Sequence, residues 1–178
     1  MKILGGKFKG KKLANCKTKT IRPAMALIRK SIFDTLKDFV VDSSVLDLCA
    51  GTGILGIEAM SRGAKNLTLV DSDVSSVKLI KKNLSLCNLD CKVIVSYLPK
   101  GLKKLNNERF NLVFLDPPYG NSIMIEETLS GLVLNQLIEK YGLILIESEE
   151  KSKFVIPQEL KLYKEKKFGN TKITILSC

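Results

Sequence analysis

Short apolar runs alternate along the chain with longer segments in which apolar residues recur every three or four positions. The first pattern is typical of buried strands, and the second is typical of helices with one apolar face. Strands are therefore expected at residues 45–48, 67–70, 92–95, 110–115, 143–147, 160–163 and 171–176. Helices are expected at residues 24–40, 53–62, 77–86 and 123–138, with a short helix beginning near Pro99.

This alternation predicts an α/β fold, with a mostly parallel sheet covered by helices on both faces. The last two expected strands meet around Gly169-Asn170, which predicts a C-terminal antiparallel hairpin. In parallel sheets, ligands bind outside the carboxyl ends of the strands. Asp47, Asp71 and Asp116 each stand at such an end. The sequence therefore predicts three acidic side chains in one cleft.

The first expected strand runs into a glycine-rich turn that opens a helix. Gly51 and Gly53 allow a tight turn that a ligand can approach, and Gly56 allows the helix to pack closely on the strand. Asp71 follows Gly51 by twenty residues, the distance at which a carboxylate reaches the ribose hydroxyls of a bound nucleotide. This pattern fits a nicotinamide cofactor and S-adenosylmethionine equally well.

Asp47 distinguishes between these two ligands. It stands at the carboxyl end of the first strand, beneath the glycine turn, where a carboxylate would repel a pyrophosphate. The methionine end of S-adenosylmethionine carries an ammonium and a sulfonium, which suit a neighbouring carboxylate. The same position is also compatible with a buried Asp47 side chain that caps the turn. Together with the motif described next, Asp47 favours the methyl donor.

The Asp-Pro-Pro-Tyr motif (Asp116-Pro117-Pro118-Tyr119) follows an apolar strand. Two prolines cannot continue a sheet ladder, because neither donates an N–H group. The chain must leave the strand at Asp116, which places a carboxylate, the Pro117 carbonyl and the Tyr119 ring together. This set can hold the exocyclic amine of a nucleobase and stack its ring. A proline-rich turn with Tyr119 packed nearby is the simpler alternative.

Positive charge is concentrated at the start of the chain. Residues 1–30 contain ten lysines and arginines and no acidic residue, and they account for nearly all of the net charge of +11. The glycines at residues 5, 6 and 10 predict a short hairpin there, although a solvated lysine-rich tail is an alternative. An ordered hairpin of this charge indicates binding to a nucleic-acid phosphate backbone. The residues expected to contact phosphate are Lys7, Lys9, Lys11, Lys12, Arg22 and Arg29.

Length and composition indicate one domain, with a basic N-terminal segment at residues 1–23 and a Rossmann-like core at residues 24–178. The chain has no apolar stretch long enough to cross a membrane and no signal-like segment. It has no histidine, and its five cysteines are scattered. Cys87 and Cys91 are therefore interpreted as buried thiols rather than zinc ligands or a disulfide. We expect a cytoplasmic monomer without a metal or a membrane partner.

The chain resembles the bacterial small-subunit ribosomal RNA guanine-N2 methyltransferases of the RsmD type over essentially its whole length. The resemblance rests on residues 3–13, Ile21-Arg22-Pro23, residues 28–34 and 47–64, the Asp-Pro-Pro-Tyr motif and residues 145–149. It implies a class I S-adenosylmethionine-dependent methyltransferase fold. It also implies that the acceptor is one guanine of 16S rRNA, within a small ribosomal subunit or an assembly intermediate. The chain departs from the family pattern at residues 24–27, Lys30 and Tyr97.

The motifs and the resemblance together define two sets of candidate residues. The acceptor set, expected to act in catalysis, is Asp116, Pro117 and Tyr119. The donor set, expected to bind S-adenosylmethionine, is Asp47, Ala50, Gly51, Thr52, Gly53, Asp71, Ser72 and Tyr97.

Three other functions share some of these features. An adenine-N6 DNA methyltransferase uses the same acceptor motif, but it usually needs additional sequence for target recognition. A dehydrogenase would bind a nicotinamide cofactor, against which Asp47 argues. A non-enzymatic RNA-binding or ribosome-assembly factor would bind RNA without transferring a methyl group.

Overall fold

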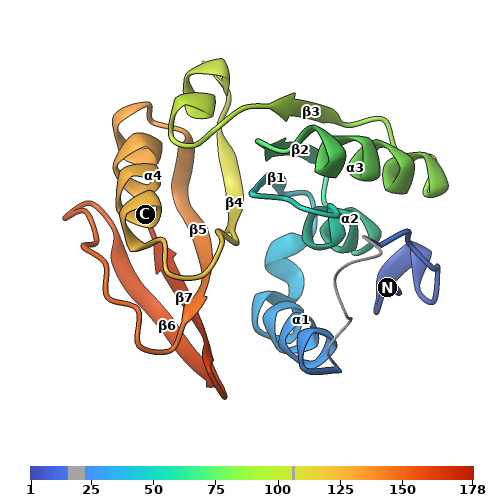
Figure 1. The fold of residues 1–178 in the computed structure, drawn as a ribbon, viewed down its shortest axis with the longest axis horizontal. Coiled ribbons are helices and arrows are strands. Elements are labelled where there is room, and N and C mark those ends of the chain that lie inside the picture. Colours follow the sequence, from blue (N-terminus) through green and yellow to red (C-terminus); the bar gives the residue numbers. More distant parts are fainter. Residues whose placement is uncertain (16–22, 106) are drawn as a thin grey trace.

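The protein is described from a computed structural model that covers residues 1–15, 23–105 and 107–178. In this part of the chain, seven strands form one sheet in the order β3-β2-β1-β4-β5-β7-β6 (Figure 1). Strands β1 to β5 pair in parallel, and β7 runs antiparallel to both β5 and β6. The predicted α/β sheet with a C-terminal antiparallel hairpin is therefore confirmed. The strands are β1 (Ser44–Leu48), β2 (Asn66–Asp71), β3 (Lys92–Val95), β4 (Phe110–Leu115), β5 (Ile138–Glu149), β6 (Lys161–Phe168) and β7 (Thr171–Ser177).

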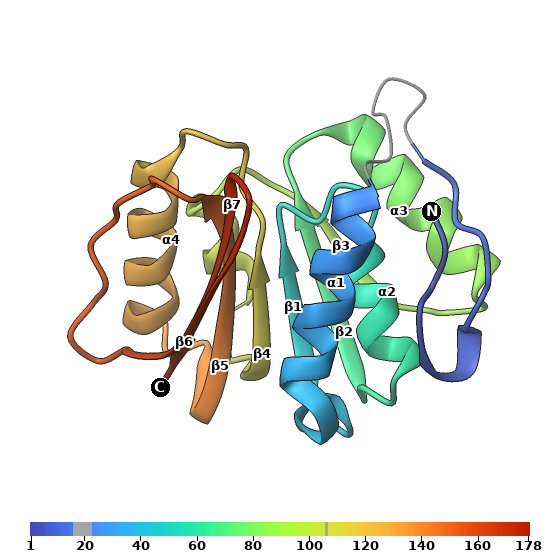
Figure 2. The ribbon, with the colours of Figure 1, turned by 90° about the horizontal axis from the view of Figure 1, so that it is seen from below.

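Helices cover both faces of this sheet, as expected. Figure 2 shows α4 on one side and α1, α2 and α3 on the other. The apolar run of β4 serves both layers, because successive side chains of a strand point to opposite faces. Leu112 and Phe114 pack in the core beneath α1, α2 and α3, while Val113 and Leu115 pack in the core beneath α4. The helices are α1 (Pro23–Leu36), α2 (Ile54–Ser61), α3 (Val74–Leu86) and α4 (Ser122–Leu134), with short 3-10 helices η1 (Gly6–Phe8), η2 (Lys37–Val40) and η3 (Lys100–Leu105).

The helix expected at residues 123–138 was predicted too long. It ends at Leu134, where the Asn135 side-chain amide donates a hydrogen bond of 2.7 Å to the Gly131 carbonyl. Gln136 then adopts a left-handed backbone with φ of 50°, and Ile138 begins β5. Asparagine side chains commonly compete with backbone hydrogen bonding in this way. The apolar residues after Leu134 continued the helical period in sequence, although they belong to the next strand.

The N-terminal arm (residues 1–15) forms the expected hairpin. Lys2 pairs with Lys12 in an antiparallel bridge, and the Ile3 N–H donates to the Lys11 carbonyl over 3.0 Å. Ile3 and Leu13 are buried in the core that contains α1, α2 and α3. The arm is thus an ordered part of the folded protein rather than a solvated tail.

Candidate functional site

The glycine turn (residues 50–53) connects β1 to α2 at the carboxyl edge of the sheet. Gly51 has a φ of 58°, a conformation that favours glycine. A side-chain carbon built on Gly51 would meet only the Cys49 carbonyl, at 3.9 Å, so a ligand has room to approach this backbone. At Gly56 the opposite holds, since such a carbon would lie 2.6 Å from the Leu67 side chain. The close packing predicted at Gly56 is therefore confirmed.

Asp71 fixes the glycine turn from the end of β2. One carboxylate oxygen accepts a hydrogen bond from the Gly51 N–H at 2.7 Å, and the other accepts from the Asp73 N–H at 2.9 Å. The next predicted donor residue, Ser72, is exposed. Tyr97 is 71% exposed in the loop that follows β3, and the neighbouring Ser96 N–H donates to the Asp71 carbonyl. The loops after three neighbouring strands therefore meet around Asp71.

Asp47 lies beneath the glycine turn and is almost completely buried, with 1% of its surface exposed. Its carboxylate accepts a hydrogen bond of 2.9 Å from the Gly56 N–H in the first turn of α2. Burial raises the pKa of Asp47 to about 7, and the negative charge of Asp71 adds to this rise, while the Gly56 hydrogen bond opposes it. The structure thus contains the alternative arrangement expected for Asp47, in which its buried side chain caps the turn that leads into α2. A contact between Asp47 and a methyl donor stays a prediction.

The Asp-Pro-Pro-Tyr motif lies directly beside the glycine turn. Leu48 and Leu115 are partners in the pairing of β1 with β4, and the Asp116 N–H donates to the Leu48 carbonyl over 3.3 Å. Pro117 is buried, whereas Pro118 and Tyr119 are exposed. The break in the strand predicted from the two prolines therefore occurs at Asp116. It places the start of the motif at the edge where the glycine turn begins.

The Tyr119 hydroxyl is held by the C-terminal hairpin. It lies 2.7 Å from the Thr171 hydroxyl oxygen at the start of β7. The Glu147 side chain of β5 lines the same shallow depression as Pro117 and Tyr119. Burial raises the pKa of Glu147, and its contact with Tyr119 opposes that rise. Neither Glu147 nor Thr171 was singled out in the sequence, because their proximity to Tyr119 depends on strand order.

Cys49 lies among the three predicted acidic residues. Burial raises the pKa of its thiol to about 12, with further contributions from the negative charges of Asp71, Asp116 and Asp47. All three carboxylates therefore lie close enough to act on one side chain. The convergence of the three strand ends was predicted, whereas the position of the Cys49 thiol among their carboxylates was not. The only indication of this position in the sequence is that Cys49 stands between Asp47 and the glycine turn.

The predicted phosphate-binding lysines lie on the surface of the N-terminal arm. Lys7, Lys9, Lys11 and Lys12 are all exposed. The Lys7 and Lys11 ammonium groups lie 5.6 and 5.8 Å from the centre of the Phe8 ring, within the range of a cation–π contact. Arg22 lies outside the described residues. These four lysines are therefore accessible to a negatively charged partner, as expected for an ordered hairpin that binds nucleic acid.

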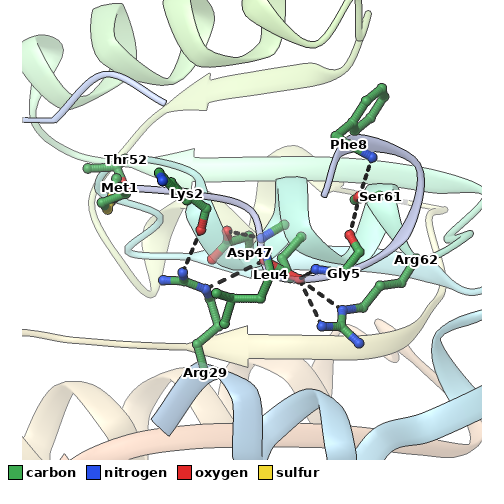
Figure 3. A network of polar contacts seen from close by, with 12 residues as sticks. Met1, Lys2, Leu4, Gly5, Phe8, Arg29, Asp47, Thr52, Ser61 and Arg62 are labelled. Carbon is green, nitrogen blue, oxygen red and sulfur yellow. Dashed lines mark hydrogen bonds and ion pairs between the residues drawn. The ribbon is translucent and has the colours of Figure 1, made fainter. Parts of the chain in front are cut away.

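Arg29 has a different role from the phosphate contact expected of it. It is only 7% exposed, and its guanidinium donates to the Lys2 carbonyl over 2.8 Å (Figure 3). Its Nε also lies 3.6 Å from a carboxylate oxygen of Glu58. This burial leaves almost no guanidinium surface for a phosphate. The prediction failed because the sequence does not show which arginine faces a buried acid.

Glu58 is the buried acid that joins the arm to the core. Its two carboxylate oxygens accept hydrogen bonds from the Leu4 and Gly5 N–H groups, each at 2.8 Å. Arg62 completes the cluster with an ion pair of 2.9 Å to Glu58. Two N–H groups of the arm and two arginine side chains, one from α1 and one from just after α2, thus surround one carboxylate, which fixes the arm against α2 (Figure 3).

The described residues contain no group of three or more histidine, cysteine, aspartate or glutamate side chains that could hold a metal ion. Cys49, Cys87, Cys91 and Cys178 are free thiols; Cys87 is buried, as expected, whereas Cys91 is only partly buried. Among residues 1–15, 23–105 and 107–178, no helix is both long and apolar enough to cross a membrane.

The sheet order and the positions of these loops define a class I, Rossmann-like methyltransferase fold. Solved structures of methyltransferases share it at low sequence identity. The protein SMU.776, solved in complex with SAH, has a TM-score of 0.69 and 15% identity over 89% of this chain and 50% of that chain. The ribosomal protein L11 methylase of Lactobacillus delbrueckii also has a TM-score of 0.69 and 15% identity, over 89% of this chain and 80% of that chain.

The chain belongs to the family described as "Conserved hypothetical protein 95", whose model matches residues 1–177. It is 32% identical to the Ribosomal RNA small subunit methyltransferase D of Escherichia coli, over 95% of this chain and 85% of that protein. The protein of the same name from Buchnera aphidicola is 33% identical, over 92% of this chain and 86% of that protein. The solved structure of yhhF from Escherichia coli has a TM-score of 0.88 and 31% identity, covering 99% and 97% of the two chains. These matches confirm the family resemblance drawn from the sequence.

Proposed function

We propose that this protein methylates the exocyclic N2 amine of a guanine in 16S rRNA, with S-adenosylmethionine as the methyl donor. The observation that carries the proposal is that the Asp-Pro-Pro-Tyr motif and the glycine turn adjoin each other. The Asp116 N–H donates a hydrogen bond to the carbonyl of Leu48, which ends the neighbouring strand just before the glycine turn. A donor bound at this turn and a base held by the Asp-Pro-Pro-Tyr motif would lie beside each other. The names of the relatives support ribosomal RNA as the substrate class.

The residues around the glycine turn fit S-adenosylmethionine. The open backbone at Gly51 admits a ligand, and Asp71 at the end of β2 would bind the ribose hydroxyls. The negative charges of Asp47, Asp71 and Asp116 suit a cationic ligand better than a pyrophosphate. When bound, S-adenosylmethionine supplies an electrophilic methyl group. The remaining donor-set residues, Ala50, Thr52, Gly53, Ser72 and Tyr97, belong to the loops that surround this position.

The Asp-Pro-Pro-Tyr motif would prepare the acceptor. A guanine amine is conjugated with its ring and is a poor nucleophile. The Asp116 carboxylate and the Pro117 carbonyl would accept hydrogen bonds from its N–H groups, which favours a pyramidal nitrogen with an available lone pair. The exposed Tyr119 ring would stack the base once it has swung out of the RNA. Positioning accounts for the rate in this scheme, and the released proton passes to Asp116 or to water.

The N-terminal arm would hold the RNA that carries the target guanine. Its exposed lysines can neutralise phosphates without reading a sequence, so recognition of the target would depend on the shape of the RNA. We therefore propose a small ribosomal subunit or an assembly intermediate as the substrate, because such a particle can hold one loop open. In this scheme the enzyme acts as a cytoplasmic monomer.

Mass spectrometry of nucleosides tests the proposal. The purified protein is incubated with S-adenosylmethionine and small ribosomal subunits from cells that lack the modification. A gain of N2-methylguanosine in 16S rRNA is the expected result, and naked 16S rRNA in a parallel reaction identifies the form of the substrate. A gain of N6-methyladenosine, or binding of RNA and donor without any methylation, would contradict the proposal.

A further inference from the structure

Asn83 connects the N-terminal arm, which is proposed to bind RNA, with the glycine turn, which is proposed to bind the methyl donor. It lies in the last turn of α3, and its side chain is completely buried. Its Oδ1 accepts a hydrogen bond of 2.8 Å from the Ala14 N–H, and its Nδ2 donates to the Ala14 carbonyl at 3.1 Å. The same Nδ2 donates to the Thr52 carbonyl at 2.9 Å. One side chain thus binds the end of the N-terminal arm and the middle of the glycine turn.

These three bonds satisfy both N–H donors and the acceptor oxygen of the Asn83 amide. The amide offers one acceptor oxygen and two N–H donors, and each finds a backbone partner. Loss of the side-chain amide would leave the partly buried Thr52 carbonyl without this donor, which is costly. A second contact joins the same parts, since the Met1 sulfur lies 3.8 Å from the Thr52 hydroxyl oxygen (Figure 3). The turn and the arm thus share the Asn83 amide and are also joined through Met1.

We propose that Asn83 is a positioning residue for the methyl donor, and that it acts by holding the end of the docked N-terminal arm, at Ala14, against the glycine turn. The arm would then serve donor binding even when no RNA is present. This inference rests on the proposed function in one respect, namely that the glycine turn binds S-adenosylmethionine. It goes further because neither Asn83 nor Ala14 is expected to touch the donor or the RNA.

Ser61 provides a matched control. Like Asn83, it is a buried polar residue that bonds the backbone of the arm, since its hydroxyl accepts from the Phe8 N–H at 2.8 Å and donates to the Gly5 carbonyl at 2.6 Å. Unlike Asn83, Ser61 forms these bonds at the far end of α2 and none with the glycine turn. Its replacement loosens the arm around Gly5 and Phe8 but leaves the bonds of Asn83 to Ala14 and Thr52 in place.

The experiment compares Asn83→Asp and Ser61→Ala with the unchanged chain. Aspartate keeps the size of the side chain but cannot donate to the Ala14 and Thr52 carbonyls, and its charge repels both. Affinity for S-adenosylhomocysteine is measured by calorimetry without RNA, and hydrogen exchange follows the arm amides. Thermal unfolding confirms that each variant is folded, and Asn83→Ala replaces Asn83→Asp if the latter does not fold.

We expect faster exchange of the arm amides in both variants, with an approximately tenfold weaker binding of S-adenosylhomocysteine only in the Asn83 variant. In the methylation assay, the KM for the donor rises in that variant while kcat at saturating donor is retained. Equal affinity in all three proteins, or equal losses in both variants, would overturn the inference. No binding by the unchanged chain would instead overturn the proposed function itself.

Discussion

The Tyr119 hydroxyl lies 2.7 Å from the Thr171 hydroxyl, which ties the proposed acceptor loop to the start of the last strand. These two residues are 52 positions apart in sequence. Their contact orients an aromatic ring that is otherwise exposed at the edge of the sheet. A ring held in one orientation loses less freedom when a base stacks on it, so the hydrogen bond should favour acceptor binding.

Thr171→Val removes the partner of Tyr119 and keeps a β-branched side chain in β7. We expect the KM for RNA to rise by about three- to tenfold, the effect of losing one hydrogen bond, with unchanged donor affinity. Steady-state methylation assays measure both quantities. Tyr119→Phe should have at least the same effect, since it also removes the contact with Glu147, and the double variant should lose no more than Tyr119→Phe alone. Additive losses would mean that the two hydroxyls act independently.

Asp116→Ala should abolish methyl transfer, because in the proposed mechanism the guanine amine would lose the carboxylate that accepts its hydrogen bonds. We expect a fall in kcat of about a hundredfold or more, with affinity for S-adenosylhomocysteine nearly unchanged. Single-turnover assays and calorimetry measure the two effects separately. Asp116→Asn distinguishes the charge from the hydrogen bond. Equal loss of transfer and of donor binding would show that Asp116 supports the fold instead.

Replacement of Lys9 and Lys12 by alanine should lower the affinity for RNA. It should also make this affinity less sensitive to salt concentration. If each lysine neutralises one phosphate of a single strand, the slope of log K against log salt falls by roughly 1.4. Binding of labelled RNA over a range of salt concentrations measures this slope. Lys140→Ala is the control, since Lys140 is exposed near the amino end of β5, away from the loops of the site. An unchanged slope in the double variant would argue against the arm as the RNA contact.

Glu58→Gln should destabilise the protein, because Arg29 and Arg62 would remain around a site without a negative charge. Removal of one partner from a buried ion pair costs about 3 kcal/mol or more of unfolding free energy. Urea unfolding monitored by circular dichroism measures the loss. Glu108→Gln serves as the control, because the Lys92–Glu108 pair is largely exposed and should contribute only about 0–1 kcal/mol. Similar losses in both variants would contradict the special role of Glu58.

Asp47 should make stability depend on pH. Its pKa is raised from 3.8 to about 7 in the folded state, so the folded protein binds this proton more tightly than the unfolded chain does. Stability from this group is therefore fully present below about pH 4 and is lost as the pH rises through about 7. Asp47→Asn removes the titration, so the variant should gain in melting temperature relative to the unchanged chain between pH 4 and pH 8. A difference that stays constant over this range would show that Asp47 does not titrate as described.

Local patterns in the sequence were sufficient for most of the elements. The strand expected at residues 92–95 is β3, and the break after β4 falls at Asp116, where two prolines exclude further pairing. The end of α4 was not predictable from periodicity, because Leu137 and Ile138 continue an apolar pattern that the backbone at Gln136 interrupts. Such boundaries depend on a single hydrogen bond or backbone angle rather than on average propensity.

The candidate site was only partly visible in the sequence. Asp47, Asp71 and Asp116 could be placed together, because each follows a strand of a parallel sheet and such strands end at one edge. Arg29 could not be distinguished from a phosphate-binding arginine, because its buried partner Glu58 is brought to it by packing. Asn83 carried no signal at all, since its three partners are backbone groups from two distant segments.

The sequence by itself thus determined the α/β class, the glycine turn, the Asp-Pro-Pro-Tyr motif and the basic N-terminal segment. These features follow from hydrophobic periodicity and from backbone restrictions that act over a few residues. Only the tertiary structure decided that Thr171 holds Tyr119, that Glu58 anchors the arm, and that Asn83 joins the arm to the glycine turn. The physical reason is that buried polar groups must find partners, and the sheet order and helix packing decide which groups are near enough to pair.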